Sequence, residues 1–178
     1  MKKNTMKIAL CGTTGALIIT ILLLGFMFPF ATYACPALAA GLLMPICFEY
    51  KVKTGFTLYV ATSFLALMLV PDQELAFMYI FVFGLFTVLK IPIDKLKKKP
   101  LRYALKLLLA NVSIAVSYAI LLFIFPVQAL VNEFSSYGAG FLISLVLMFN
   151  IMLLIYDKAI EKVLLLYIYR FRKKLFKH

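Results

Sequence analysis

The sequence predicts an all-α membrane protein, a compact bundle of about six transmembrane helices with both termini in the cytoplasm. Hydrophobic residues make up 65% of the 178 residues and charged residues only 15%, and the mean hydropathy is +1.02. Soluble domains are about 45–50% apolar and about 25% charged, and a chain this short cannot bury such an excess in one core. This composition excludes a soluble enzyme, a nucleic-acid-binding domain and a disordered tail.

The first three helices follow from apolar runs that end at charge or proline. A bilayer core about 30 Å thick requires about 20 helical residues, and fewer where the membrane thins. The first run covers residues 8–28 and ends at Pro29. The second covers residues 36–50 and begins with a proline, which suits a first helical turn. The third covers residues 55–70 and ends at Pro71, because proline cannot continue a helix interior.

The last three helices are bounded in the same way. The fourth run covers residues 75–91 and ends at Pro92, the fifth covers residues 103–125, and the sixth covers residues 138–156. The second, third and fourth runs are short, so five or seven spans are the alternatives to six. We expect residues 1–156 to form a single six-helix transmembrane domain.

The basic residues set the orientation of the bundle. With a cytoplasmic N-terminus, all 19 Lys and Arg residues fall in the inner segments, and the outer loops carry only Asp72, Glu74 and Glu133. The positive-inside rule therefore predicts that both termini are cytoplasmic and that the number of spans is even. The inner segments are residues 1–7, 49–54, 90–106 and 157–178.

Residues 157–178 form a basic tail whose apolar residues recur at helical spacing. Five basic residues lie mostly off the apolar stripe: Lys162, Arg170, Lys173, Lys174 and Lys177. This pattern predicts an amphipathic helix on the inner leaflet, attracted by anionic lipids. Binding of a cytoplasmic protein is the alternative interpretation of the same charges.

The N-terminus imitates a signal peptide, because lysines precede an apolar stretch. That stretch has about 21 residues, which exceeds the usual 7–15 of a signal peptide, and Tyr33 before Ala34 does not fit a lipoprotein cleavage site. We therefore expect the first run to be retained as a transmembrane helix, with cleavage as the alternative.

Cysteine and histidine offer no metal or catalytic pattern. Cys11, Cys35 and Cys47 lie in or beside apolar runs without a CxxC pair, and His178 is the single histidine. Such cysteines are typical of reduced, buried thiols. We expect no metal site and no cofactor.

Small residues line the start of the first run. Gly12 and Ala16 form a small-xxx-small pattern, with Ala9 and Gly15 nearby. Such a face lets another helix approach the backbone closely. The partner is either a helix of the same chain or a separate membrane subunit.

Two amides are placed where unpaired polar groups are costly. Asn111 and Asn150 should lie at similar depth in antiparallel neighbouring helices. We favour a mutual hydrogen bond between these buried polar residues that holds the two helices together, with a ligand contact as the alternative.

Polar and aromatic residues gather at the expected outer ends of the helices. They offer acceptors, amides and phenols to a small organic solute, although a solvated rim with tyrosines in the aromatic belt explains any one of them. The candidate solute-binding residues are Tyr33, Asp72, Glu74, Tyr79, Ser117, Tyr118, Asn132, Glu133 and Tyr137.

No P-loop is present, so we expect the chain not to hydrolyse ATP itself. Within the expected spans we see no paired carboxylates for proton- or sodium-driven coupling.

Taken together, residues 7–156 resemble the S components of energy-coupling factor (ECF) transporters, the bacterial vitamin-uptake systems. The resemblance is carried by six short spans, by the small face of Ala9, Gly12 and Ala16, and by the Pro-Ala-Leu-Ala-Ala-Gly segment at residues 36–41. It implies capture of a vitamin or cofactor precursor near the extracellular side, then docking through the first helix to a membrane coupling subunit driven by two ATPases. Gly12 and Ala16 would form the docking face, extended by Ala9 or Gly15.

One departure from such pockets is the absence of Trp, often a ring-stacking residue. A tyrosine among Tyr33, Tyr79, Tyr118 and Tyr137 would have to take that role.

Our leading hypothesis is therefore a non-enzymatic, substrate-binding transport subunit in the bacterial cell membrane, with no nucleic-acid partner. The alternative is a membrane scaffold of an envelope or morphogenesis complex, similar to the MreD family. A lipid-modifying enzyme is disfavoured, because neither a catalytic dyad nor a metal-binding motif is apparent.

Overall fold

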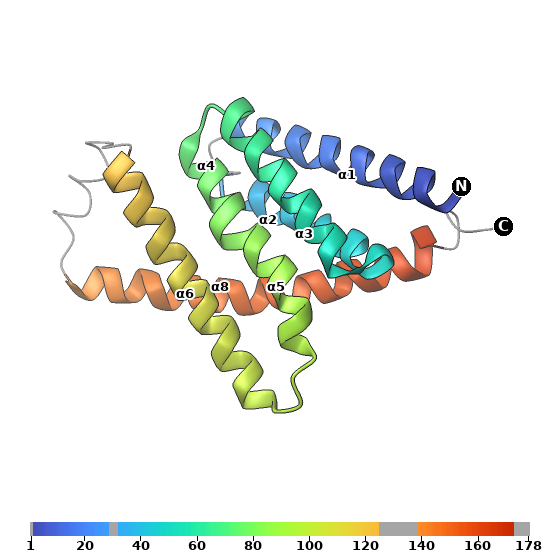
Figure 1. Cartoon of the computed structure of the whole chain (residues 1–178). Coiled ribbons are helices and arrows are strands. Elements are labelled where there is room, and N and C mark those ends of the chain that lie inside the picture. Colours follow the sequence, from blue (N-terminus) through green and yellow to red (C-terminus); the bar gives the residue numbers. More distant parts are fainter. Residues whose placement is uncertain (1, 29–31, 125–138, 173–178) are drawn as a thin grey trace.

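A computed structural model describes residues 2–28, 32–124 and 139–172, which are almost entirely helical and contain no strand (Figure 1). The all-α prediction is confirmed for these residues. Three stretches in the described ranges, Asn4–Met27, Leu43–Leu69 and Gln73–Asp94, are long and apolar enough to cross a membrane. The elements are α1 (Lys2–Met27), α2 (Ala34–Gly41), α3 (Leu43–Leu69), α4 (Gln73–Phe77), η2 (Met78–Gly84), α5 (Leu85–Asp94), α6 (Lys99–Ile124), α8 (Ala139–Leu166) and η3 (Tyr167–Arg172).

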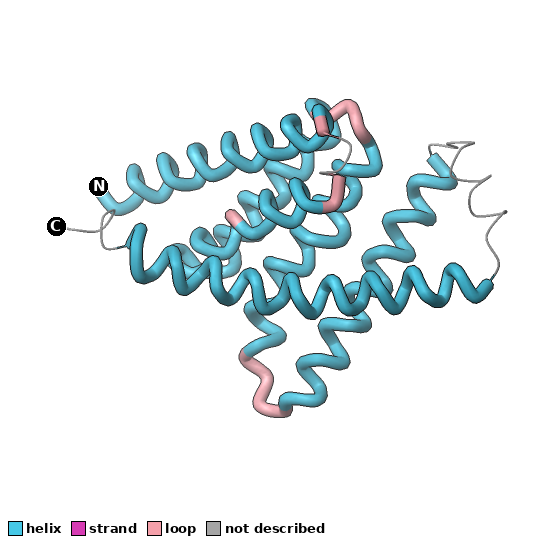
Figure 2. Tube along the Cα trace, turned by 180° about the vertical axis from the view of Figure 1, so that it is seen from behind, coloured by secondary structure: helices cyan, strands magenta, loops and turns pink. Residues whose placement is uncertain are grey.

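The helices form two groups that are crossed by one long helix. α1 packs against α2 and α3, whereas α6 packs against η2 and α5. α8 runs across the other helices rather than beside them, passing behind them in Figure 1 and in front of them in Figure 2. It contacts α2, α3 and α6, and so adds to the direct packing of the two groups, in which α2 contacts η2 and α3 contacts α5.

α3 is a helical hairpin rather than one straight helix. Tyr50 and Lys51 leave the helical conformation, and Lys51 has a φ of 71°, a region that residues other than glycine rarely adopt. The bend separates the second apolar run from the third, within the segment expected to face the cytoplasm. A Cβ on Gly55 would overlap the Cys47 sulfur, so the absence of a side chain at residue 55 lets the two arms pack closely.

The continuous helix from α4 through η2 to α5 forms the centre of the bundle. Of its most apolar stretch 67% is buried, against 28% for α1 and 22% for α3. The Asp72 carboxylate caps its first turn by accepting from the backbone N–H of Glu74 at 3.0 Å. η2 is a π-helical turn, and the Tyr59 hydroxyl donates to the Ile80 carbonyl at 2.6 Å.

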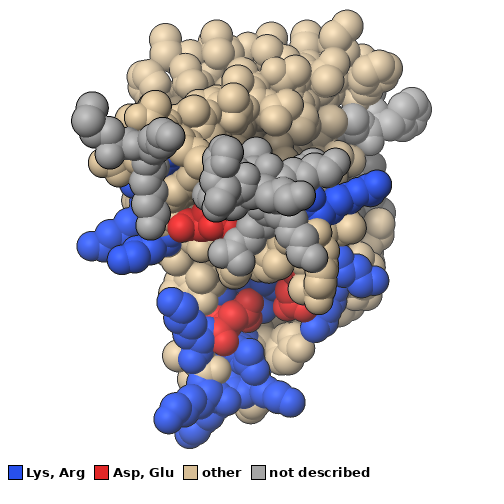
Figure 3. Space-filling model, turned by 90° about the vertical axis from the view of Figure 1, so that its right-hand side faces the viewer, with Lys and Arg blue, Asp and Glu red and all other residues tan. Residues whose placement is uncertain are grey.

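The outside of the fold is strongly apolar. Ile8, Met68 and Met148 are 70–73% exposed, and the upper part of the face in Figure 3 carries no charged side chain. Exposed apolar surface costs about 25 cal/mol per Å² in water, but costs nothing against hydrocarbon. Such an exterior suits a chain embedded in a bilayer. Basic side chains gather in the lower half of the same view.

α8 extends further than the sixth apolar run. It continues without a break past residue 157 to Leu166 and passes directly into η3. The first part of the expected tail is therefore an extension of the last long helix. Asp157 and Glu161 lie inside that helix, and their partners are described next.

Candidate functional site

Five charged side chains from three helices meet at one place, which we call the charge network: Lys90 and Asp94 from α5, Lys106 from α6, and Asp157 and Glu161 from α8. Lys90 is 1% exposed and Asp157 2% exposed. Lys90 and Asp94 are four residues apart on one helix, as are Asp157 and Glu161, so each pair lies on one face.

Lys90 is the most deeply buried cation of the network. Its Nζ donates to Asp157 Oδ1, and also to the Asp157 carbonyl oxygen at 2.9 Å. Glu161 Oε1 accepts from the same ammonium at 3.2 Å. Asp94 Oδ2 lies 3.6 Å away. The three N–H groups of Lys90 therefore all have acceptors, as a buried ammonium requires.

Lys106 completes the network from the opposite helix. Its Nζ lies 2.6 Å from Asp94 Oδ1 and donates to both carboxylate oxygens of Asp157, at 2.9 and 3.0 Å. Asp157 is thus held between two ammonium groups. Each ion loses hydration energy on burial. The attraction between the opposite charges offsets this loss only if all three helices hold this geometry.

The pKa of Asp157 reflects two opposing causes. Burial raises the pKa, but hydrogen bonds and charge from Lys90 and Lys106 outweigh burial and hold the pKa below the ordinary value of 3.8. Asp157 lies just beyond the expected sixth span. The carboxylate is therefore ionised at neutral pH.

Carboxylate oxygens of Asp94, Asp157 and Glu161 lie within 4.8 Å of one another, a grouping that resembles a cation site. Two lysine ammonium groups already pair with these oxygens. The arrangement is therefore best explained as an ion-pair network that fastens α5, α6 and α8 together.

A second polar contact joins α6 to α8. Asn111 Nδ2 donates to Asn150 Oδ1 at 3.0 Å, and Asn150 Nδ2 donates to Asn111 Oδ1 at 3.2 Å. Each amide also donates to a carbonyl one turn earlier in its own helix, at 2.8 Å. The two amides therefore satisfy each other between the helices.

Three of the candidate solute-binding residues lie close together at the start of α2 and α4. The Tyr33 hydroxyl donates to Glu74 Oε1 at 3.1 Å, and Asp72 caps the turn that carries Glu74. This group is exposed or half-buried, so it lies where a solute can reach it.

Two other candidates lie inside the bundle. Tyr79 is fully buried, with its hydroxyl 2.7 Å from Thr62 Oγ1. Ser117 is 1% exposed and donates to the Phe77 carbonyl at 3.4 Å. The Tyr118 side chain lies outside the part of the structure that is described, as do Asn132, Glu133 and Tyr137.

The small residues of α1 divide between two faces. Gly15 faces the bundle, where a Cβ would lie 3.4 Å from Leu58 Cδ1. Ala9, Gly12 and Ala16 are exposed, and a Cβ on Gly12 would meet nothing within 4 Å. Three of the four are therefore left uncovered by the described part of the chain.

The charge network is the feature that sequence reasoning missed. In the sequence alone its lysines count as topology signals of inner segments, and its carboxylates belong to no motif. The signal that was available is the spacing of four between Lys90 and Asp94 and between Asp157 and Glu161, each next to an apolar run. Such spacing indicates that each helix continues past its apolar run, with the two charged residues on one face.

No family model matches the chain, and neither a curated protein nor a solved structure matches it. Its function must be inferred from the contacts described above.

Replacing Asp157 by Asn should lower the free energy of unfolding by about 3 kcal/mol, because Lys90 and Lys106 would lose the buried carboxylate that they share and keep only Asp94 and Glu161 as counter-charges. Thermal or denaturant unfolding in detergent measures this loss. The control is Lys158→Gln, which removes an exposed ion pair to Glu161 at 3.7 Å and should cost less than about 1 kcal/mol. Equal effects of the two variants would contradict the importance of the network.

The low pKa of Asp157 also predicts how stability depends on pH. Its folded pKa lies below the unfolded value of 3.8, so its contribution is full above that value and is lost as the pH falls through the folded pKa. The melting temperature should therefore drop below about pH 4. The drop should be smaller in Asp157→Asn, and an equal drop in both proteins would contradict this assignment.

Proposed function

We propose that this chain is a non-enzymatic membrane subunit that docks to a separate membrane protein through the exposed small face of α1. We call Ala9, Gly12 and Ala16 the α1 docking face. The observation that carries the proposal is that these residues lie on the outside of the bundle, with no described residue close to the position of a Cβ on Gly12. A helix that has already packed its small residues inside its own fold has no such surface to offer.

Membrane helices gain no hydrophobic energy from associating, because lipid is as apolar as their side chains. Close backbone approach at small residues provides the attraction instead. The Thr13 hydroxyl donates to the Ala9 carbonyl at 3.0 Å and the Thr20 hydroxyl to the Ala16 carbonyl at 2.9 Å. The face therefore needs no polar partner and suits contact with another helix.

Within this class we propose a substrate-binding subunit similar to an ECF S component. It would take a small vitamin-type or cofactor-precursor solute at the extracellular side and dock to a coupling subunit with ATPases in trans. The group of Tyr33, Asp72 and Glu74 supports this role, because it places a phenol and two carboxylates at the expected outer end of the bundle. We propose further that the chain lies in the bacterial cell membrane, spans it six times and has both termini in the cytoplasm.

A membrane scaffold, similar to the MreD family, is the second candidate. It is favoured by the burial of Tyr79 and Ser117, whose hydroxyls bind inside the fold. A scaffold would use the α1 docking face in the same way but would retain no solute.

Leucine at Gly12 or at Ala16 should reduce recovery of the membrane partner at least tenfold when the tagged chain is purified in mild detergent, because the added bulk separates the helices. The matched control is Ala61→Leu, which adds the same bulk to an exposed position on α3. All three variants should keep the melting temperature of the wild type. Unchanged partner recovery in both α1 variants would overturn the docking proposal.

Native mass spectrometry of the same preparations separates the two candidates. A substrate-binding subunit should retain a small molecule in the wild type and in both α1 variants, and should lose it in Glu74→Gln. Partner recovery without any retained small molecule would contradict solute binding and support the scaffold.

A further inference from the structure

Two neighbouring cavities lie between α6 and α8, beside the charge network. One, of about 220 Å³, is lined mainly by charged residues, among them Lys99, Arg102 and Lys158. The other, of about 570 Å³, has an apolar wall that belongs to α8. Tyr103, Asp157 and Lys158 line both, so the two cavities adjoin at these residues. We call them together the hollow, with a charged end and an apolar end.

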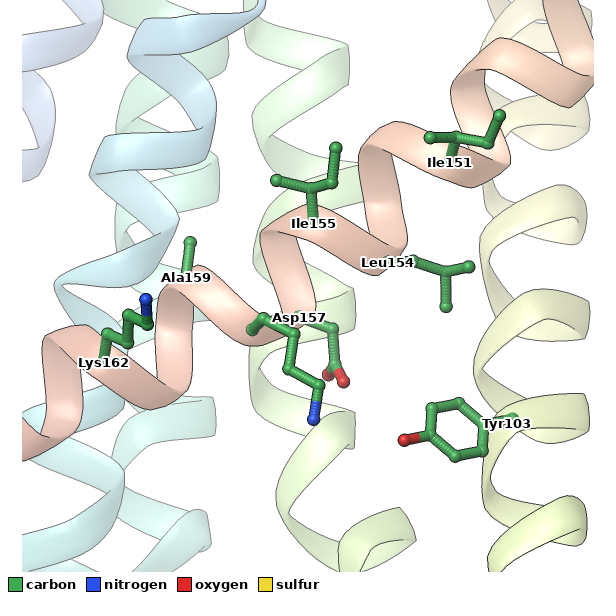
Figure 4. A pocket seen from close by; sticks show the side chains of 8 residues that line it. Tyr103, Ile151, Leu154, Ile155, Asp157, Ala159 and Lys162 are labelled. Carbon is green, nitrogen blue, oxygen red and sulfur yellow. The ribbon is translucent and has the colours of Figure 1, made fainter.

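The apolar end is open to the surroundings of the protein. Its wall is formed by Ile151, Leu154 and Ile155, which are 58%, 40% and 66% exposed. Figure 4 shows Leu154 and Tyr103 facing the gap between the two helices, with the Tyr103 hydroxyl turned toward Asp157. A phenol at the boundary between apolar and charged surface is typical of the membrane interface.

The charged end has an excess of positive charge. Lys90 and Lys106 offset two of the three carboxylates of the network, which leaves one negative charge against the cations of Lys99, Arg102 and Lys158. Lys158 also lies 3.7 Å from Glu161. The local net charge is therefore positive, as an anion requires.

Arg102 supplies a second, independent observation. Its Nη1 donates to the Asp94 carbonyl oxygen at 3.3 Å, but its buried Nε has no hydrogen-bond partner in the described part of the chain. A buried guanidinium N–H without an acceptor is costly. Because Arg102 lines the charged cavity, a rotation of its side chain would bring this N–H to a ligand oxygen there.

We propose that this hollow binds one anionic glycerophospholipid of the inner leaflet. Arg102, Lys99 and Lys158 bind its phosphate oxygens, since guanidinium and ammonium groups are the usual protein ligands of phosphate. The Tyr103 hydroxyl lies at the level of the glycerol, and one acyl chain covers the apolar wall at Leu154. Charge complementarity and the amphiphilic shape of the hollow select this occupant over a free phosphate, which would leave the apolar end unused.

Native mass spectrometry after exchange into lipid micelles tests the proposal, with phosphatidylglycerol and phosphatidylcholine as probes. The wild type should retain phosphatidylglycerol at least tenfold more than phosphatidylcholine. Arg102→Gln should lower this preference about fivefold, as expected for one basic group near a phosphate. The matched control is Lys97→Gln, which removes one exposed charge from the loop just before α6 without lining either cavity and should leave the preference unchanged.

Three results would overturn the proposal: no preference for phosphatidylglycerol, equal loss in Arg102→Gln and Lys97→Gln, or full displacement of the lipid by millimolar inorganic phosphate. Equal loss in the two variants would indicate general attraction of the lipid to the basic surface. Displacement by inorganic phosphate would indicate a phosphate site that binds no lipid chain. If Arg102→Gln does not fold, Lys99→Gln and Tyr103→Phe test the same cavity. Leu154→Asn, at the apolar end, should weaken lipid retention without affecting inorganic phosphate.

Discussion

The structure depends on one constraint: a polar group away from water must find its partner inside the protein. The charge network meets it by placing Asp157 between the ammonium groups of Lys90 and Lys106. The amides of Asn111 and Asn150 meet it between the same pair of helices. Because each pairing needs two helices at a fixed separation, polar groups determine how α6 and α8 cross, whereas apolar contacts alone would permit several crossings.

The same constraint explains what the exterior offers to partners. On the α1 docking face the threonine hydroxyls are satisfied within their own helix, so nothing polar opposes contact with a second apolar helix. At the hollow between α6 and α8 the buried Arg102 Nε has no acceptor among the described residues, and there the proposed partner carries an anionic group. The partners that we propose for the two surfaces therefore differ, a membrane helix at one and a lipid headgroup at the other.

Much of the helical layout can be predicted from the sequence, because charge and proline interrupt the apolar runs. The end expected at Pro92 is wrong, since α5 continues through this proline to Asp94. The bend at Tyr50 and Lys51 lies in an expected inner segment, and the pairing of Asn111 with Asn150 follows from their depth. The charge network was missed because a lysine at the end of a run is also a topology signal. The charged residues face one another only because α5 extends to Asp94 and α8 extends beyond residue 157. Of the outer candidates, the contact of Tyr33 with Glu74 depends on how α2 meets α4, which residue patterns do not encode.

The proposed docking requires Gly12 to face a separate membrane protein. A photo-reactive amino acid at position 12, activated in native membranes, tests this contact, with position 61 on α3 as the reference. We expect a discrete cross-linked product of higher mass from position 12, identifiable by mass spectrometry as a membrane protein, and none from position 61. Cross-linking to lipid alone at position 12, or identical products from both positions, would contradict docking through this face.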